Sequence, residues 1–144
     1  MNITWTQFGE ICERLAREVA ASPEVDAVVG VALGGDIAGA TIASLAHKDY
    51  YPIRLARRED GAHHHTRRVV VPPPRELAGK RVLLVDDLSL TGDTFKIASL
   101  ELKQVGVQSV TTLVLVRTGD AYRADHTGLV VEAPPRFPWQ RQVN

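Results

Sequence analysis

The chain has a single cysteine, Cys12, among its 144 residues, so it cannot form an internal disulfide bond. Cys12 falls among apolar positions with helical spacing, which favours a buried core residue over a catalytic thiol. The sequence also lacks an apolar stretch of about 18 residues and a signal-peptide pattern. We therefore expect a cytoplasmic protein that has no contact with a membrane.

An excess of charge is missing as well, because 17 lysine and arginine residues balance 17 aspartate and glutamate residues. Nucleic-acid-binding proteins usually carry a basic surface, so this balance gives no indication of a nucleic-acid partner. Internal repeats and a long Pro/Gly/Ser linker are absent too. With 44% hydrophobic and 24% charged residues, the composition is that of an ordinary globular protein and predicts one domain over residues 1–144.

Apolar runs alternate with helical patterns along most of the chain. The spacing of apolar residues predicts a first helix through residues 8–19, with Thr4 or Thr6 as its N-cap. Continuous apolar runs predict strands at 25–32, 51–55, 69–71, 82–85 and 110–116, and helices are expected at 37–46 and 95–105. This alternation predicts an α/β fold, a doubly wound, mostly parallel sheet with helices on both faces. The tail from residue 122 is expected to be irregular.

The most informative segment runs from Val82 to Thr94, with the sequence VLLVDDLSLTGDT. Four apolar residues, typical of a buried parallel strand, are followed directly by Asp86 and Asp87, and a Thr/Gly-rich turn then begins a helix. Open α/β sheets bind ligands at the carboxyl ends of their strands. Two carboxylates there can hold sugar hydroxyls or a hydrated cation, and the free N–H groups of a helix start suit a phosphate. The residues predict a site for a sugar phosphate with a metal ion.

This segment resembles the 5-phosphoribosyl-1-pyrophosphate (PRPP) loop of the type I phosphoribosyltransferases, which has an apolar run, an acid pair and a Thr-Gly-x-Thr turn. The resemblance implies that Asp86 and Asp87 hold the ribose hydroxyls, directly or through Mg²⁺ as the cofactor. It also implies that the following turn binds the 5′-phosphate. The residues of that turn are Ser89, Leu90, Thr91, Gly92, Asp93 and Thr94.

A second strand end turns into a helix at Leu33, Gly34 and Gly35. Two glycines let the backbone approach an anion closely, with the helix N-terminus behind it. The glycine spacing matches neither a nucleotide P-loop nor the dinucleotide fingerprint, and an ordinary tight turn is the alternative. The segment resembles the pyrophosphate-binding loop of the same family, in which these three residues would offer backbone N–H groups.

Residues 57–68 are polar, charged and rich in histidine, which by itself predicts an exposed surface loop. Their place between the two ligand loops, as in the family, implies a lid that excludes water from the reaction. The arginines that could neutralise a leaving pyrophosphate are Arg57, Arg58, Arg67 and Arg68. The three histidines at 63–65 are adjacent and have no partner Cys/His cluster, so a structural metal is disfavoured.

The tail, residues 122–144, contains a Pro/aromatic segment. Phe137 and Trp139 could stack on a planar base, and Arg117, at the end of the preceding strand, could donate to an exocyclic carbonyl. Ordinary packing of the segment is the alternative. The tail resembles the small C-terminal hood of the bacterial and archaeal xanthine/guanine phosphoribosyltransferases, and the start of the chain, Ile3-Thr4-Trp5, is also similar to theirs.

The chain departs from that group in two places. The 6-oxopurine enzymes usually carry an aspartate beside N7 of the base, where this chain has Leu90. The small xanthine/guanine enzymes often have an acid after the tryptophan of the tail, where this chain has Gln140, so the match is weaker there. Leucine can pack against a base but cannot move a proton. Specificity for a 6-oxopurine is therefore open, although guanine, xanthine or hypoxanthine is expected before adenine.

The leading hypothesis is a Mg²⁺-dependent phosphoribosyltransferase that joins a nitrogenous base, expected to be a purine, to PRPP and releases pyrophosphate and a nucleotide. The alternative is a non-catalytic PRPP- or nucleotide-binding regulator on the same fold. A phosphotransfer receiver domain is disfavoured, because the last long strand ends in Arg117 and Thr118 rather than the lysine that such domains need. Dimers are common in the resembled family, so a homodimer is compatible with the sequence, but no apolar stripe demands one.

Overall fold

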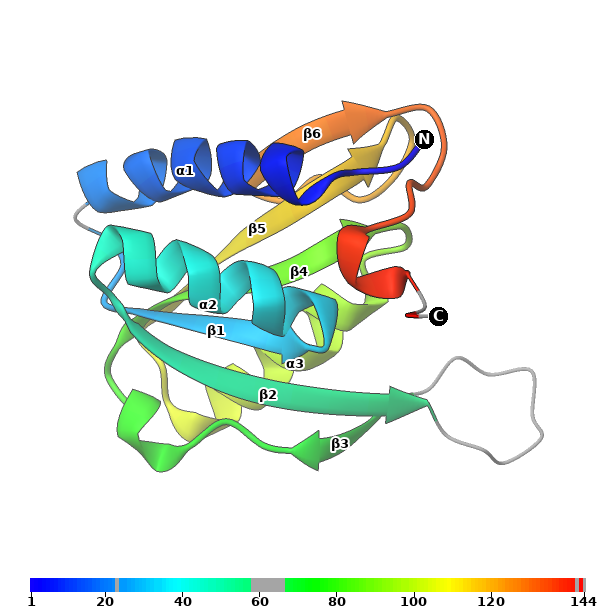
Figure 1. Cartoon of the computed structure of the whole chain (residues 1–144). Coiled ribbons are helices and arrows are strands. Elements are labelled where there is room, and N and C mark those ends of the chain that lie inside the picture. Colours follow the sequence, from blue (N-terminus) through cyan, green and yellow to red (C-terminus); the bar gives the residue numbers. More distant parts are fainter. Residues whose placement is uncertain (23, 58–66, 142, 144) are drawn as a thin grey trace.

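The computed structural model describes residues 1–22, 24–57, 67–141 and 143. Its sheet has the strand order β3-β2-β1-β4-β5-β6 (Figure 1). The strands are β1 (Ala27–Ala32), β2 (Asp49–Arg57), β3 (Arg67–Val71), β4 (Arg81–Ser89), β5 (Ser109–Thr118) and β6 (His126–Val131). Neighbouring strands are parallel, apart from the antiparallel pair β2 and β3. The carboxyl ends of the parallel strands therefore lie along one edge of the sheet.

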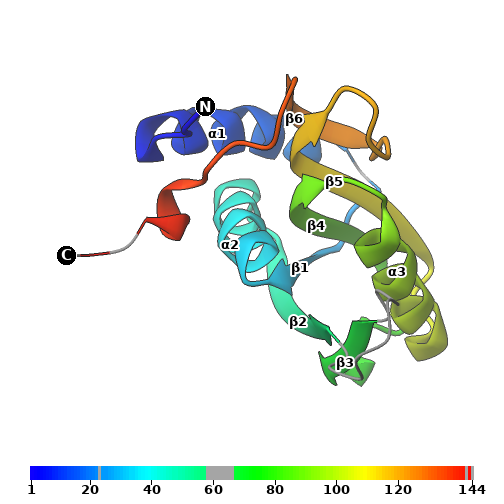
Figure 2. The same ribbon diagram turned by 90° about the vertical axis from the view of Figure 1, so that its right-hand side faces the viewer.

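Helices cover both faces of this sheet. Helices α1 (Trp5–Ala21) and α2 (Gly34–Ala46) pack on one face, and α3 (Asp93–Val105) packs on the other (Figure 2). Two short 3-10 helices, η1 (Arg75–Leu77) and η2 (Pro138–Gln140), complete the elements. The predicted doubly wound α/β fold is confirmed. Within the part of the chain described, no helix combines the length and apolar character needed to cross a membrane.

The buried side chains of the central strands divide between the two faces of the sheet. Along β4, Leu83 packs with α1 and α2, whereas Leu84 packs with α3, and both are fully buried. Successive side chains of a strand point to opposite faces, so a strand covered on both sides is apolar throughout. This arrangement explains the continuous apolar runs that made β1, β4 and β5 predictable.

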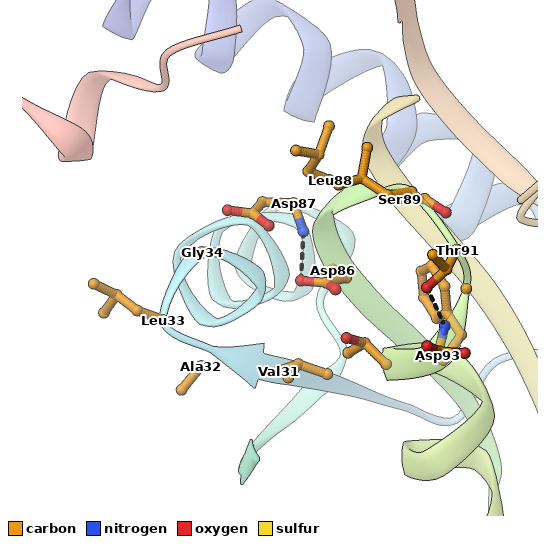
Figure 3. Close-up of a pocket in the computed structure, with 14 residues that line it drawn as sticks. Val31, Ala32, Leu33, Gly34, Asp86, Asp87, Leu88, Ser89, Thr91 and Asp93 are labelled. Atoms are coloured by element: carbon orange, nitrogen blue, oxygen red, sulfur yellow. Dashed lines mark hydrogen bonds between the residues drawn. The ribbon is translucent and has the colours of Figure 1, made fainter. Parts of the chain in front are cut away.

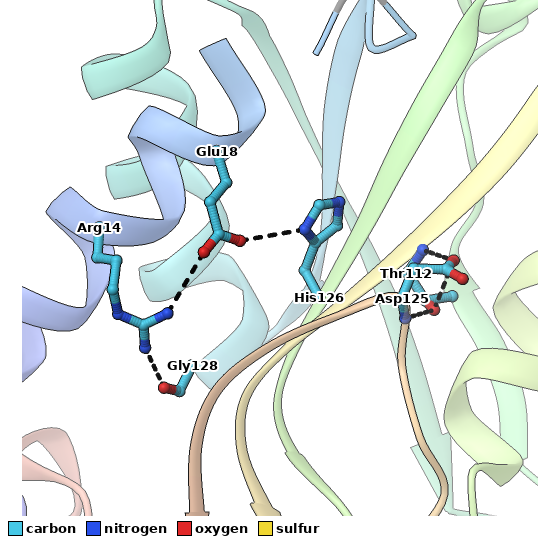
Figure 4. A network of polar contacts seen from close by, with 6 residues as sticks. All are labelled: Arg14, Glu18, Thr112, Asp125, His126 and Gly128. Atoms are coloured by element: carbon cyan, nitrogen blue, oxygen red, sulfur yellow. Dashed lines mark hydrogen bonds and ion pairs between the residues drawn. The ribbon is translucent and has the colours of Figure 1, made fainter. Parts of the chain in front are cut away.

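Helix α1 is fastened at its start and along its outer side. Thr4, one of the two expected N-caps, begins the helix through a capping box. Further along, Glu18 Oε2 lies 3.3 Å from Nδ1 of His126, and the guanidinium of Arg14 donates to the carbonyl oxygen of Gly128 (Figure 4). Both of these contacts reach β6, so α1 holds the edge strand against the sheet.

Several elements extend beyond their predicted bounds; β2 and β3, for example, include Arg57, Arg67 and Arg68 of the predicted surface loop. Three further differences concern the site and the tail. Helix α2 begins at Gly34, three residues before the expected start, because its two glycines form the first helical turn. Strand β4 continues beyond the acid pair and pairs with β5 as far as Ser89. The expected irregular tail contains β6, which pairs with β5 in parallel. Since β6 is an edge strand that is only partly buried, it carries no continuous apolar run to mark it. The residues expected to form a hood therefore include a strand of the sheet.

Candidate active site

The carboxyl ends of β1 and β4 border a cavity of about 440 Å³. These strands are parallel neighbours, so the loop from β1 to α2 and the turn from β4 to α3 meet at the same edge of the sheet (Figure 3). The predicted site residues that line the cavity are Leu33, Gly34, Asp86, Asp87, Ser89, Leu90, Thr91, Gly92, Asp93 and Thr94. The sequence prediction did not include the other lining residues, Val31, Ala32, Leu88 and Phe95. Gly35, the second residue of α2, is buried and is not among the lining residues.

The acid pair lies at the centre of the cavity, between the two loops (Figure 3). The backbone N–H of Asp87 donates to Oδ1 of Asp86 at 2.9 Å, which orients the Asp86 carboxylate. Burial raises the pKa of Asp87 above its usual value, and a hydrogen bond with the Asp86 side chain opposes that shift in part. A desolvated carboxylate is stabilised by a cation or by hydroxyl donors. The pair is therefore suited to a ligand that supplies either of these.

The backbone of α2 approaches β4 so closely that side chains have no room between them. A Cβ atom on Gly34 would collide with the Asp87 carboxylate, and one on Gly35 would lie 2.5 Å from the carbonyl oxygen of Val85. The close contact of α2 with β4 therefore requires glycine at both positions, whether or not an anion binds there. The peptide bond just before them, between Ala32 and Leu33, is cis.

Two helix N-termini, those of α2 and α3, open at this cavity. Leu33 is the N-cap of α2 and Gly92, at φ +84°, is the N-cap of α3, and neither residue supplies a side-chain cap. At the start of α3, the N–H of Asp93 donates to Oγ1 of Thr91 at 3.3 Å. Helix α1, which begins away from the cavity, has a full capping box. The first N–H groups of a helix lack acceptors within it and carry the positive end of its dipole. The cavity therefore presents two anion-binding ends on either side of a carboxylate pair.

The turn between β4 and α3 is held from outside by Tyr122, which the sequence prediction did not include. The hydroxyl of Ser89 donates to the carbonyl oxygen of Tyr122 at 3.1 Å, and the N–H of Tyr122 donates to the carbonyl oxygen of Leu90 at 3.1 Å. The Ser89 side chain is buried, so its hydroxyl proton is used within the protein. Tyr122 stands in an irregular segment, where no sequence pattern marks it.

The first turn of α2 has a similar support from β2. The hydroxyl of Tyr50 makes a short hydrogen bond to Asp36, and burial raises the pKa of Tyr50 so that it stays protonated as a donor. A Cβ atom on Gly39 would lie 2.9 Å from Cε1 of Tyr50, so glycine at this position of α2 leaves room for the tyrosine ring. Tyr50 was not included in the sequence prediction, and its contact with the loop was missed.

The residues predicted to bind the base do not line the cavity. Phe137 is only 1% exposed and stacks on Trp139, with ring centroids 4.7 Å apart and planes at 6°. Trp139 also contacts Phe8 edge-on, with centroids 5.4 Å apart. The Nη1 group of Arg117 donates to a neighbouring carbonyl oxygen at 3.1 Å. For Phe137 the base-stacking prediction is wrong, because its ring is enclosed in the core, and packing of the tail on α1 accounts for this segment.

Only the two ends of the predicted lid lie within the described residues. Arg57 and Arg67 pair across β2 and β3, and Arg68, the next residue of β3, is exposed. Arg58 and the histidines at 63–65 lie outside the described residues. The role of these arginines stays a prediction.

A metal ion bound in this cavity would need some of its ligands from a substrate. Among residues 1–22, 24–57, 67–141 and 143, no group of three His, Cys, Asp or Glu side chains gathers to hold a metal. Mg²⁺, however, usually binds through one or two carboxylates and completes its shell with substrate phosphates and water. The carboxylate oxygens of Asp86 and Asp87, at the centre of an anion-binding cavity, fit that mode of binding.

Comparisons with known proteins agree with this geometry. The family model described as "Phosphoribosyl transferase domain" matches residues 4–143. The orotate phosphoribosyltransferase of Methanospirillum hungatei JF-1 is 27% identical over 135 residues, which cover 93% of this chain and 74% of the relative. That of Methanocorpusculum labreanum is 29% identical over 107 residues, 73% of this chain, and the match spans only 59% of the relative's length. The purine phosphoribosyltransferase of Pyrococcus horikoshii Ot3 superposes with a TM-score of 0.89 at 24% identity, covering 100% of this chain and 96% of that one.

Proposed function

The chain belongs to the phosphoribosyltransferase family, and from that premise we propose that it transfers the 5-phosphoribosyl group of PRPP to a nitrogenous base and releases pyrophosphate. One observation carries the proposal, the carboxylate pair that lies between two helix N-termini in one cavity. PRPP has a matching order of groups, because its ribose hydroxyls lie between a phosphate at one end and a pyrophosphate at the other.

Each part of PRPP has a counterpart in the cavity. The start of α3, with residues 91–94, would bind the 5′-phosphate, and Leu33 to Gly35 at the start of α2 would bind the pyrophosphate. Asp86 and Asp87 would accept hydrogen bonds from the ribose hydroxyls. With pyrophosphate oxygens, the same two carboxylates would hold Mg²⁺, which neutralises charge on the leaving group when it is bound. The lid arginines proposed to assist there are Arg57, Arg58, Arg67 and Arg68.

The reaction is a substitution at C1′ of the ribose. A nitrogen of the base forms a bond to C1′, while the bond from C1′ to pyrophosphate breaks and its electron pair leaves with the pyrophosphate. The base gives up one N–H proton to water, so that the product carries a neutral base ring in N-glycosidic linkage. The protein contributes by fixing the two ends of PRPP, so that C1′ is held in line between the leaving group and the base. The N–H groups at the start of α2 would stabilise the negative charge that develops on the pyrophosphate.

We propose a purine as the base, with orotate as the second candidate. The end-to-end superposition on a purine phosphoribosyltransferase supports the purine, and the curated orotate phosphoribosyltransferases at 27% and 29% identity support orotate. Leu90 lies on the cavity wall with 53% of its surface exposed. Its side chain can pack against either base, but it offers neither base a proton donor or acceptor.

The test is release of pyrophosphate from PRPP and Mg²⁺ in the presence of guanine, hypoxanthine, xanthine, adenine or orotate, with a reaction lacking any base as the control. Turnover with a 6-oxopurine is the expected result, and turnover with orotate alone would replace the purine assignment. If PRPP binds but no base gives turnover, the protein is a PRPP-binding regulator and the enzymatic proposal is refuted.

A further inference from the structure

The connection between β5 and β6 lies against the turn that precedes α3. Through its backbone, Tyr122 bonds two consecutive turn residues, accepting from the Ser89 hydroxyl and donating to the Leu90 carbonyl, both at 3.1 Å. Tyr122 follows Ser89 by 33 residues in the sequence, so these bonds join distant segments of the chain. The turn is therefore fastened at its start by a part of the chain that does not line the cavity.

The ring of Tyr122 covers the middle and end of the same turn. A Cβ atom on Gly92 would lie 2.7 Å from Cγ and Cδ2 of the ring, so the ring packs directly on the backbone of this glycine. The ring centroid is also 5.5 Å from that of Phe95, which is 2% exposed in the first turn of α3. Bonded at Ser89 and Leu90 and covered at Gly92 and Phe95, the turn is held along most of its length.

We propose that Tyr122 is a positioning residue for the 5′-phosphate site, an inference that rests on the proposed function. The turn needs its N–H groups aligned to bind a phosphate, and its glycine, with φ +84°, makes the free backbone adaptable. A flexible turn must lose conformational entropy when the ligand binds, and this loss weakens binding. By packing on Gly92, the Tyr122 ring keeps the turn in its binding conformation before the phosphate arrives.

The chemistry of Tyr122 provides a matched pair of variants. Within the described part of the chain, its hydroxyl group makes no hydrogen bond, and the side chain is 41% exposed. Tyr122→Phe keeps the ring and both backbone bonds. Tyr122→Ala keeps the backbone bonds but removes the ring from Gly92. The difference between these variants therefore isolates the contact of the ring with the turn.

The experiment titrates ribose 5-phosphate and, separately, Mg²⁺-pyrophosphate into the full-length wild type and both variants by calorimetry. For Tyr122→Ala we expect the Kd of ribose 5-phosphate to rise about tenfold, or ~1.4 kcal/mol. The Kd of pyrophosphate, which would bind at the start of α2, should stay the same, and Tyr122→Phe should bind both ligands as the wild type does. Hydrogen exchange of the amides at 90–93 should accelerate only in Tyr122→Ala.

Two results would overturn the inference. One is an unchanged Kd of ribose 5-phosphate in Tyr122→Ala, and the other is an equal weakening of both ligands, which would indicate a general loss of structure. A wild type that binds neither ligand would instead refute the proposed function itself. If Tyr122→Ala does not fold, Ser89→Ala removes the hydroxyl bond at the other end of the contact, and it should weaken ribose 5-phosphate selectively as well.

Discussion

Replacing Gly34 by alanine should weaken PRPP binding in a protein that still folds. The new Cβ atom would collide with the Asp87 carboxylate, so that side chain must rotate out of its place in the cavity. Crowding of this kind costs ~1–3 kcal/mol of unfolding free energy. Alanine recovers up to ~1 kcal/mol, because glycine is the poorer helix former. We therefore expect a folded protein that is less stable by ~0–3 kcal/mol.

The same substitution should weaken PRPP binding, because it moves a carboxylate that is proposed to contact the ligand. A hydrogen bond to a charged group contributes ~1.5–3 kcal/mol. Displacing the Asp87 carboxylate should therefore weaken PRPP by about 10- to 100-fold, at 1.4 kcal/mol per factor of ten. Calorimetric titration of PRPP with Mg²⁺, together with urea unfolding, measures both effects.

The control for this substitution is Gly9→Ala in α1, where a Cβ atom would meet nothing within 4 Å. It should raise the unfolding free energy by about 0.5–1 kcal/mol and leave PRPP binding unchanged. If Gly34→Ala binds PRPP as tightly as the wild type, the carboxylate of Asp87 is not part of the ligand site and the reasoning is refuted.

Three further changes test other parts of the structure. Burial raises the pKa of Asp87 in the folded state above its value of about 3.9 in the unfolded chain. This burial lowers the stability of the folded state at neutral pH, where the carboxylate is charged in the unfolded chain. Asp87→Asn should therefore raise the Tm at neutral pH, with a gain that shrinks as the pH falls through about 4; a lower Tm at neutral pH would contradict this. Burial also raises the pKa of the Cys12 thiol to about 12, so a thiol reagent should label native protein slowly and unfolded protein quickly, and fast native labelling would be inconsistent with a core position. Phe137→Ala should lower the unfolding free energy by ~3–5 kcal/mol in urea, whereas a negligible loss would restore the ring as a candidate base contact.

The predictable part of the fold is the part buried on both faces of the sheet. β1, β4 and β5 are enclosed by helices on both sides, and this enclosure makes each a continuous apolar run. β6 lies at the edge, with only Gly128 buried, so its sequence resembles a loop. The early start of α2 was missed because glycine has a low helix propensity, and only the close packing on β4 explains why Gly34 belongs to the helix.

The predictable part of the site is the part whose residues are adjacent in the chain. Asp86 and the turn that follows it form one motif, and parallel pairing of β1 with β4 brings the glycine loop beside them, as the expected topology requires. Contacts between the site and distant segments of the chain could not be predicted, because no sequence motif joins the two partners. Tyr122 reaches the turn from the β5–β6 connection, and this contact also directs the Ser89 hydroxyl away from a ligand role. Phe137 was misassigned because exposed and buried aromatic residues look alike in sequence.

The central claim is that one cavity binds PRPP through the acid pair. Calorimetric titration of PRPP with Mg²⁺ into the wild type and into the Asp86→Asn/Asp87→Asn double variant tests it most directly, with a thermal melt to show that the variant folds. We predict saturable binding to the wild type and loss of that binding in the double variant. A wild type that does not bind PRPP, or a double variant that binds it equally well, would contradict the account.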